Sequence, residues 1–432
     1  MKKETNFYRK RVFDDILKFR LRVFGAVLIT GPKGCGKTRT ASEISKSKVE
    51  FQDEEIREYY ISLANNFPSK LLDGEKPRLF DEWQDAPKLW GSIRKYCDDH
   101  PQDNGMFILT GSSSNDVNTP HTGTLRISEL EMLPMSLFES GESTGEISLL
   151  ELFNQPNKFL PCESKLSIDD IIYAICRGGW PKALLENGKQ EQLYIAKDLF
   201  NQTCKKDMSS LDNIKRNANW AKAILKAYAR NICTIASSKT IFTDVNFNCG
   251  ISESTFYEYI DALERLYIID DIEAWSPQLR SKTTIRSKPK RNLIDPSIAV
   301  AALGASPESL KRDFNTLGFL FESLVIRDLK AYSAKAGGEL SFYRDRYNLE
   351  ADAVLHLDDG RYALIEIKLG NDKIDEGAKH LKEIERLINE FNSKNPKFKM
   401  RLPDLKIVIT GTRFAQKRDD GVFVIPIGCL KD

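Results

Sequence analysis

Three short apolar runs, each followed by a polar turn, stand out in the first part of the chain. They occupy residues 26–29, 79–80 and 106–109. Apolar runs of this length without polar alternation are typical of strands that are buried on both faces of a parallel sheet. Because ligands of such sheets bind at the carboxyl ends of the strands, we expect the turns after these runs to carry the chemistry.

Helical periodicity dominates the middle of the chain. Apolar residues recur at helical spacing in residues 167–176, 191–208, 219–234 and 252–269. A further amphipathic helix is expected at residues 316–337, followed by strands at 340–346, 350–357 and 362–370. The pattern therefore predicts an α/β chain: a parallel-sheet domain, a helical middle domain and a second α/β domain.

The size and composition of the chain set the broad class of protein. A chain of 432 residues is too long to fold around one ordinary hydrophobic core. We therefore expect three domains, at residues 1–160, 161–300 and 301–432. The net charge of +2 means that any nucleic-acid contact must come from local patches. The eight cysteines form no Cys-x-x-Cys pair, which argues against a zinc ribbon or a disulfide scaffold.

The N-terminal residues lack the apolar core and cleavage site of a signal peptide, and the apolar runs are far shorter than the roughly 20 residues of a membrane helix. We therefore expect a cytoplasmic protein without membrane segments, in a reducing compartment.

The first apolar run leads into a sequence that fits the phosphate-binding pattern G-x-x-x-x-G-K-[ST]. Glycines allow the backbone to wrap a phosphate chain, Lys37 would meet the β- and γ-phosphates of ATP, and the Thr38 hydroxyl would ligate Mg²⁺. The alternative is a glycine-rich turn, which the strand before the motif disfavours. We assign nucleotide contacts to Gly31, Pro32, Lys33, Gly34, Cys35, Gly36, Lys37, Thr38 and Arg39.

The second and third runs supply the expected partners of that loop. Asp81 would hold the Mg²⁺ ion through water, and Glu82 would polarise the attacking water. Without the phosphate loop upstream, this acidic pair would be better explained as an exposed turn. The presence of that loop reverses the preference. Ser112, after the third run, is a candidate sensor of the γ-phosphate, with a Gly/Ser turn as the equal alternative.

These motifs, taken in order, resemble a family of bacterial and archaeal AAA-type ATPases with a C-terminal domain of unknown function of the DUF4143 type. The resemblance spans about residues 10–370 and rests on "GPKGCGKT", "LFDEWQ", "ILTGSSS", "TGTLRISELEMLPMSLFESGES", "CRGGWPKAL" and "GFLFESLVIRDL". It implies an arginine that approaches the nucleotide or a neighbouring subunit of a homo-oligomer. Arg126 is the candidate here, although the glycine that precedes it is shifted, and Arg177 is a second candidate. Surface or interdomain ion pairs are the alternative for both arginines.

A basic run follows the helix predicted at residues 252–269. That helix and the strand expected after it resemble a winged-helix element. The run "QLRSKTTIRSKPKRNL" would suit a DNA backbone, although the acids on the helix would repel phosphates, and winged helices often only pack. The cations of the run are Arg280, Lys282, Arg286, Lys288, Lys290 and Arg291.

The last predicted strands carry acids and a lysine among apolar residues. Glu366 and Lys368 project from one face of a strand, and Asp352 on the paired strand would lie across from them. This order resembles the restriction-endonuclease-like fold with its PD-(D/E)xK motif. Asp352 and Glu366 would hold Mg²⁺, or Mn²⁺ instead, and Lys368 would stabilise charge on a phosphate. Glu322 and Glu350 are auxiliary candidates, and a surface hairpin with ion pairs is the alternative.

The three expected domains are therefore a P-loop ATPase domain at residues 1–160, a helical lid and winged-helix domain at 161–300 and a restriction-endonuclease-like domain at 301–432. Three functions remain open on the sequence. The first is an ATP- and Mg²⁺-dependent ATPase coupled to a nuclease-like domain that acts on DNA. The second is an ATP-gated switch whose nuclease-like domain binds nucleic acid or a protein without cutting. The third, less favoured, is a plain ATPase chaperone.

Overall fold

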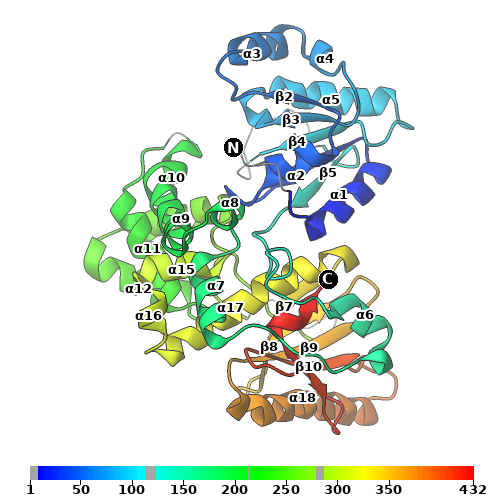
Figure 1. Cartoon of the computed structure of the whole chain (residues 1–432), viewed down its shortest axis with the longest axis vertical. Coiled ribbons are helices and arrows are strands. Elements are labelled where there is room, and N and C mark those ends of the chain that lie inside the picture. Colours follow the sequence, from blue (N-terminus) through cyan, green and yellow to red (C-terminus); the bar gives the residue numbers. More distant parts are fainter. Residues whose placement is uncertain (1–7, 112–122, 213, 279–286) are drawn as a thin grey trace. The chain divides into compact units, whose positions relative to one another are not determined.

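The computed structural model of the chain describes residues 8–111, 123–212, 214–278 and 287–432 (Figure 1). Contacts divide the chain into two compact units. Unit 1 comprises residues 1–134, 208–214 and 261–268, and unit 2 comprises residues 135–207, 215–260 and 269–432. The domain boundaries expected at residues 160 and 300 stay predictions. Among the described residues, every helix is too short or too polar to cross a bilayer.

Unit 1 is built on a five-stranded parallel sheet in the order β2-β3-β4-β1-β5. Its strands are β1 (Ala26–Thr30), β2 (Ser47–Glu50), β3 (Arg78–Asp81), β4 (Phe107–Thr110) and β5 (Ile127–Glu131). In the register of the sheet, Thr110 stands beside both Asp81 and Ile29. The parallel sheet predicted from the three apolar runs is confirmed, and the polar ends of β1, β3 and β4 lie at one edge.

Helices of unit 1 cover this sheet because their apolar faces complete its core. Leu89 and Ile93 of α5 pack with Phe80 and Phe107 of the sheet, and all four are fully buried. The helical elements are α1 (Val12–Val23), α2 (Lys37–Ile44), α3 (Arg57–Asn66), α4 (Pro68–Leu71), η1 (Trp83–Asp85) and α5 (Lys88–Asp99).

The middle of the chain is helical, as predicted. Ser167 caps α7 through a reciprocal capping box with Asp170, and Ser252 accepts a hydrogen bond from the Thr255 N–H at the start of α13, as expected. The elements are β6 (Ile147–Ser148), α6 (Leu149–Asn154), η2 (Pro156–Lys158), α7 (Ile168–Arg177), α8 (Pro181–Leu185), α9 (Lys189–Gln202), η3 (Thr203–Asp207), α10 (Met208–Ser210), α11 (Ala218–Arg230), α12 (Ser238–Cys249), α13 (Glu253–Arg265), α15 (Pro296–Leu303) and α16 (Pro307–Leu310).

Two cations of the predicted basic DNA patch, Lys290 and Arg291, are buried after the helix α13, and the patch as a whole stays a prediction. Lys290 is 1 % exposed and Arg291 is 6 % exposed. The Arg291 guanidinium is 2.5 Å from the Asp271 carboxylate, and Lys290 lies against carboxylates described below. Of the six cations of the run, Arg280, Lys282 and Arg286 lie outside the described residues, which leaves Lys288 as the exposed one among those described. Acids distant in the sequence neutralise the charges of Lys290 and Arg291, so these two side chains do not contribute to a cationic surface.

The C-terminal part of unit 2 is a mixed six-stranded sheet in the order β11-β12-β10-β9-β8-β7. Strands β7, β8 and β9 form an antiparallel meander, whereas β9, β10 and β12 run parallel. The elements are α17 (Phe314–Ser333), η4 (Ala334–Ala336), β7 (Glu339–Arg344), β8 (Glu350–His356), β9 (Tyr362–Lys368), η5 (Asn371–Lys373), α18 (Ile374–Lys394), β10 (Leu405–Thr410), β11 (Gln416–Lys417), β12 (Phe423–Pro426), η6 (Ile427–Cys429) and β13 (Leu430–Lys431).

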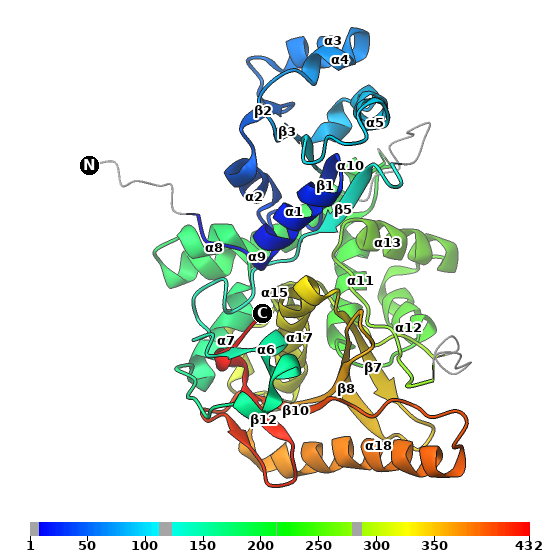
Figure 2. The ribbon, with the colours of Figure 1, turned by 90° about the vertical axis from the view of Figure 1, so that its right-hand side faces the viewer.

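Two helices sandwich this sheet (Figure 2). Helix α18 packs Leu381, Ile384 and Ile388 against one face, and α17 contacts β7, β8 and β9 on the other. The helix and the three strands expected at residues 316–370 are present with bounds shifted by a few residues at most. This sandwich fixes the acidic strands β8 and β9 beside the acidic residue of α17.

Candidate nucleotide site and acidic cleft

The loop between β1 and α2 has the backbone that its glycines predict. Gly31, Gly34 and Gly36 have φ angles of 129°, 82° and 106°, and α2 begins directly after Gly36. A Cβ atom on Gly31 would stand 2.2 Å from the Met132 carbonyl oxygen, so a larger residue does not fit there. The loop therefore offers backbone N–H groups and a helix N-terminus to an anion.

Lys37 lies under this loop with its ammonium on loop carbonyls. Its Nζ atom donates to the Gly31 oxygen at 2.9 Å and to the Pro32 oxygen at 3.0 Å. Arg11 connects the loop to the segment after β5. Its guanidinium donates to the Cys35 oxygen of the loop at 2.8 Å and to the Leu133 oxygen at 2.8 Å. Sequence reasoning missed Arg11, because a single arginine before a helix carries no recognisable pattern.

The polar ends of β1, β3 and β4 meet as the parallel sheet requires. The hydroxyls of Thr38 and Thr110 donate to the same Asp81 oxygen, at 2.7 Å and 2.5 Å. Hydroxyl and carboxylate oxygens at this spacing are the donor types that Mg²⁺ takes beside a nucleotide, so these residues fit that ion. Among the described residues, Thr110 is the polar residue at the end of β4 that contacts Asp81.

Glu82 lies next to this group in a strained backbone conformation. Its φ angle of 53° is left-handed, and its carboxylate accepts a hydrogen bond from the Gln84 amide. Burial raises the pKa of Glu82, although the hydrogen bond from Gln84 and the charge of Lys37 oppose this shift. Non-glycine residues with such backbones often occur at functional sites.

The arginine and serine sensors have different outcomes. Ser112 lies outside the described residues. The Arg126 guanidinium is 2.7 Å from the exposed Asp98 carboxylate, and its sensor role stays a prediction. Arg177 is buried and forms a two-pronged ion pair with Glu142 at 2.7 Å and 2.8 Å. Both residues belong to unit 2, and the sensor role of Arg177 stays a prediction.

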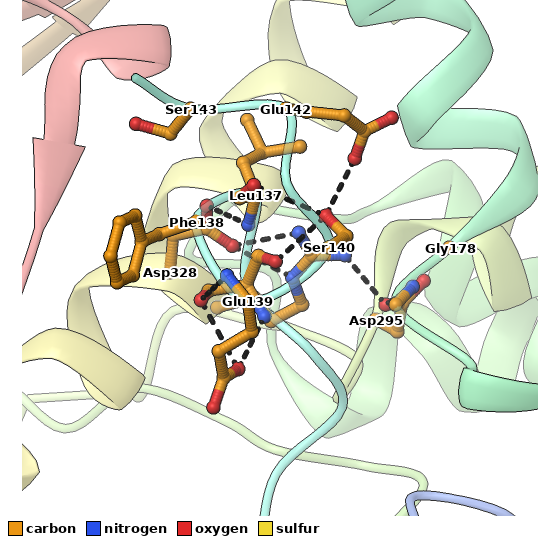
Figure 3. A network of polar contacts seen from close by, with 12 residues as sticks. Leu137, Phe138, Glu139, Ser140, Glu142, Ser143, Gly178, Asp295 and Asp328 are labelled. Atoms are coloured by element: carbon orange, nitrogen blue, oxygen red, sulfur yellow. Dashed lines mark hydrogen bonds and ion pairs between the residues drawn. The ribbon is translucent and has the colours of Figure 1, made fainter. Parts of the chain in front are cut away.

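The segment 135–143, at the start of unit 2, is held by a buried polar network (Figure 3). The Leu137 N–H donates to Asp328 of α17 at 2.9 Å, and the Phe138 N–H donates to the Tyr332 hydroxyl at 3.2 Å. Arg327 lies between Asp295 and Asp328, at 2.9 Å and 2.7 Å. The "PMSLFES" and "IRDL" motifs meet in this network, and "GGWP" joins it because the Gly179 N–H donates to Asp295 at 2.9 Å.

The acids and lysine of β8 and β9 come together as predicted from their spacing. Lys368 Nζ is 3.1 Å from the Asp352 carboxylate and also contacts the Glu366 carboxylate. The Ile367 N–H donates to the same Asp352 oxygen at 2.7 Å. His380 of α18, which the sequence did not indicate, lies 3.1 Å from Glu366 through Nδ1.

A second lysine holds the auxiliary acids. Lys290 Nζ is 2.7 Å from Glu322 of α17, 3.0 Å from Glu350 of β8 and 3.0 Å from the Asp352 carbonyl oxygen. The sequence did not predict this role, because Lys290 occurs in a basic run that resembles a solvated surface.

Burial and charge act against each other in this cluster. Burial raises the pKa of Glu366 to about 9, and the neighbouring Asp352 charge adds to the shift. Burial also raises the pKa of Glu322 to about 7 against the opposing charge of Lys290. Burial would raise the pKa of Asp352 too, but Lys290 and Lys368 outweigh it and lower that pKa.

The cluster opens into a cleft of about 850 Å³. Glu322, Asp352 and Lys368 line it together with the cations Lys373 and Arg413. Asp352 and Glu366 supply two carboxylates, which fit one hard cation with water completing its shell. Among the described residues, no group of three or more His, Cys, Asp or Glu side chains has the arrangement of a metal site.

Three families match successive parts of the chain. The AAA domain family matches residues 24–140, a domain of unknown function (DUF8612) matches residues 168–309, and a domain of unknown function (DUF4143) matches residues 317–430. No curated protein matches the chain significantly.

Several solved structures are similar to parts of the chain. The Walker-type ATPase PABY2304 of Pyrococcus abyssi is 15% identical with a TM-score of 0.41, and the match covers 69% of this chain and 97% of that one. A variant of Thermotoga maritima RuvB is 15% identical with a TM-score of 0.25, over 60% of this chain and 87% of that one. A signal-transduction ATPase with a tetratricopeptide repeat sensor from Pyrococcus horikoshii is 14% identical with a TM-score of 0.23, over 78% and 50%.

The family matches agree with the motif order described above. They confirm the AAA domain and the DUF4143 domain that the resemblance implied. The chain thus carries an AAA ATPase domain followed by two domains of unknown function.

Proposed function

We propose that unit 1 binds ATP with Mg²⁺ and hydrolyses it. The observation that carries this proposal is the meeting of Thr38, Asp81 and Thr110 beside the phosphate loop. Lys37 would leave its loop carbonyls for the β- and γ-phosphates, and Thr38 and Asp81 would hold the ion. When bound, the ion would supply positive charge that neutralises charge on the phosphates.

Glu82 is the proposed base that orients the attacking water. It follows Asp81 directly in the sequence. Its raised pKa makes its carboxylate a better proton acceptor. The hydrogen bond from Gln84 would fix the direction of its carboxylate.

Two substitutions separate nucleotide binding from hydrolysis. Lys37→Ala should abolish binding of a fluorescent ATP analogue, whereas Glu82→Gln should bind it and lose turnover. The matched controls are Lys95→Ala, whose side chain is 72% exposed, and Glu58→Gln on the surface of α3. An unchanged ATPase rate in Glu82→Gln would show that another group acts as the base.

We further propose that the C-terminal module has a restriction-endonuclease-like fold and acts on DNA. The order α17, β7, β8, β9, α18 and β10 and the contacts of Lys368 with both Asp352 and Glu366 support this. Asp352 and Glu366 would hold one Mg²⁺ or Mn²⁺ ion, which would polarise a phosphodiester and a water. Lys368 would donate to the phosphate oxygen on which charge develops.

The helices α11, α12 and α13, with the antiparallel bridges Ile269–Leu293 and Ile272–Lys290 behind them, support a winged-helix assignment for this region. The acidic Glu253 in the first turn of α13 and the burial of Lys290 favour a packing role over a DNA-reading role for this element.

A cutting assay tests the C-terminal module. Linear, circular and branched DNA would be incubated with the protein, ATP and Mg²⁺ or Mn²⁺. Cutting should occur and should be lost in Asp352→Asn and in Lys368→Met, but not in Asp359→Asn, an exposed residue of the β8–β9 turn. DNA binding without cutting under every metal would instead favour the ATP-gated switch that grips its partner.

A further inference from the structure

Lys290 sits in a cage of oxygen atoms inside unit 2. Its ammonium is 2.7 Å from Glu322 Oε1, 3.0 Å from Glu350 Oε1 and 3.0 Å from the Asp352 carbonyl oxygen. The Phe342 ring centroid lies 5.4 Å away, and the lysine side chain is 1 % exposed. Three oxygens and an aromatic face thus surround one buried positive charge.

The cage is assembled from four separate parts of the fold. Helix α17 supplies Glu322, β8 supplies Glu350 and Asp352, β7 supplies Phe342, and Lys290 arrives from the segment before α15. Two carboxylates and a carbonyl are the oxygen donors that hard divalent cations prefer. Here an ammonium, with three N–H donors, makes those contacts instead.

Asp352 belongs to both halves of the acidic cluster. Its carbonyl oxygen faces Lys290, and its carboxylate faces Lys368 at 3.1 Å. Its position therefore links the caged ammonium to Lys368 and Glu366, and Asp352 and Lys368 line the cleft.

We infer that Lys290 is the built-in cation of this cluster: its ammonium fills the cage of Glu322, Glu350 and the Asp352 carbonyl, so the C-terminal cleft takes at most one divalent cation. That one cation would lie at Asp352 and Glu366, a part of the inference that rests on the proposed function. The assignment of the cage to Lys290 does not rest on it.

The physical reason is that moving the Lys290 ammonium out of the cage costs much free energy. A divalent ion that entered the cage would push a buried lysine away from both of its carboxylates, and an unpaired buried charge is strongly disfavoured. The lysine is also part of the chain, so it competes at a fixed, high local concentration. A freely dissolved ion has neither advantage.

Removing the ammonium distinguishes a cage from an ordinary ion pair. Lys290→Met keeps the length of the side chain, removes the cation beside Glu322 and leaves Glu350 with Arg344 at 3.7 Å. A preformed oxygen cage should then bind Mn²⁺, whereas a mere ion pair should leave two acids that repel each other and bind none.

The experiment counts Mn²⁺ ions by calorimetry and electron paramagnetic resonance on nucleotide-free full-length protein. All forms would carry Asp81→Asn, which removes the carboxylate proposed to hold the ion at the nucleotide site, so that this site does not contribute. The parent should bind at most one ion, Lys290→Met should bind one more, and Lys290→Met with Glu322→Gln should lose that extra ion.

Thermal unfolding keeps the test decisive if Lys290→Met is unstable. Added Mn²⁺ should raise the melting temperature of Lys290→Met towards that of the parent, and should not do so with Glu322→Gln present. The inference is overturned if the parent binds two ions and Glu322→Gln removes one, or if Lys290→Met neither gains an ion nor regains stability. A parent that binds none, beside a Lys290→Met that binds one, supports the cage and removes the metal site of the proposed nuclease.

Discussion

At the scale of single residues, burial decides what a charged side chain does. Lys288 and Lys290 are two positions apart, yet one is exposed and the other lies among carboxylates. Sequence patterns assigned both to one basic surface. The hydrophobic and polar order along the chain does not say which acids a distant helix or strand will bring to a lysine.

The phosphate loop offers a matched pair of glycines. Gly31→Ala should abolish nucleotide binding, because its Cβ would stand 2.2 Å from the Met132 oxygen at a φ of 129°. Gly34→Ala, at a φ of 82° with open space around it, should carry only backbone strain of roughly 1–2 kcal/mol. Binding of a fluorescent ATP analogue measures both, and equal losses in the two variants would contradict the steric argument.

Lys76 gives unit 1 a dependence on pH. Burial lowers the pKa of Lys76 from 10.5 to about 8, so between these values the unfolded chain binds the proton more tightly. Stability should therefore rise with pH through this window. Lys76→Met should be more stable than the parent at pH 7 and should flatten the rise.

Urea midpoints at pH 7 and at about pH 9.5 would measure this difference. Lys48→Met, whose side chain is 54% exposed, is the control. A parent and a Lys76→Met variant with the same slope against pH would disprove the role of Lys76.

At the scale of elements, α17 carries two separate charge clusters. Near its middle Glu322 faces Lys290. One and a half turns later Arg327 pairs with Asp328, which holds the segment 135–143 through the Leu137 N–H. The helix was predictable from its periodicity. Its polar residues on a buried face were the sign that it holds partners, but the identity of the partners was not predictable.

Arg327→Met should destabilise unit 2 by about 3–5 kcal/mol, because it leaves Asp295 and Asp328 buried and unpaired. The urea midpoint of the far-ultraviolet circular dichroism signal would measure the loss. Arg386→Met on the exposed face of α18 is the control and should leave the midpoint unchanged. A midpoint shared by the parent and Arg327→Met would show that the network contributes nothing.

At the scale of the whole chain, nucleotide binding and unfolding are linked. ATP with Mg²⁺ at one hundred times its dissociation constant should stabilise the native protein by about 2.7 kcal/mol, because the unfolded chain has no phosphate loop. Calorimetric melting with and without the nucleotide measures the shift.

Lys37→Ala should remove the nucleotide-induced shift, and Asp352→Asn should keep it, since Asp352 belongs to unit 2. A shift that survives in Lys37→Ala would place the nucleotide elsewhere.

The sequence by itself determined the local features of this protein. The strand–loop–helix around Gly31, the acids after β3 and the i, i+2 pair Glu366 and Lys368 follow from short-range sterics and periodicity, which neighbouring residues impose. The order of the elements also followed, because each amphipathic pattern is local.

Only the tertiary structure decided which distant charges meet. Arg11 at the loop, Arg177 on Glu142, His380 on Glu366 and Lys290 in its cage all join residues that are far apart in the chain or carry no motif. Desolvation makes buried charges pair with whatever opposite charge the fold supplies, and that supply depends on packing rather than on neighbouring residues. The acids of β8 and β9 were visible in the sequence, but the lysine that lies between Glu322 and Glu350 was not.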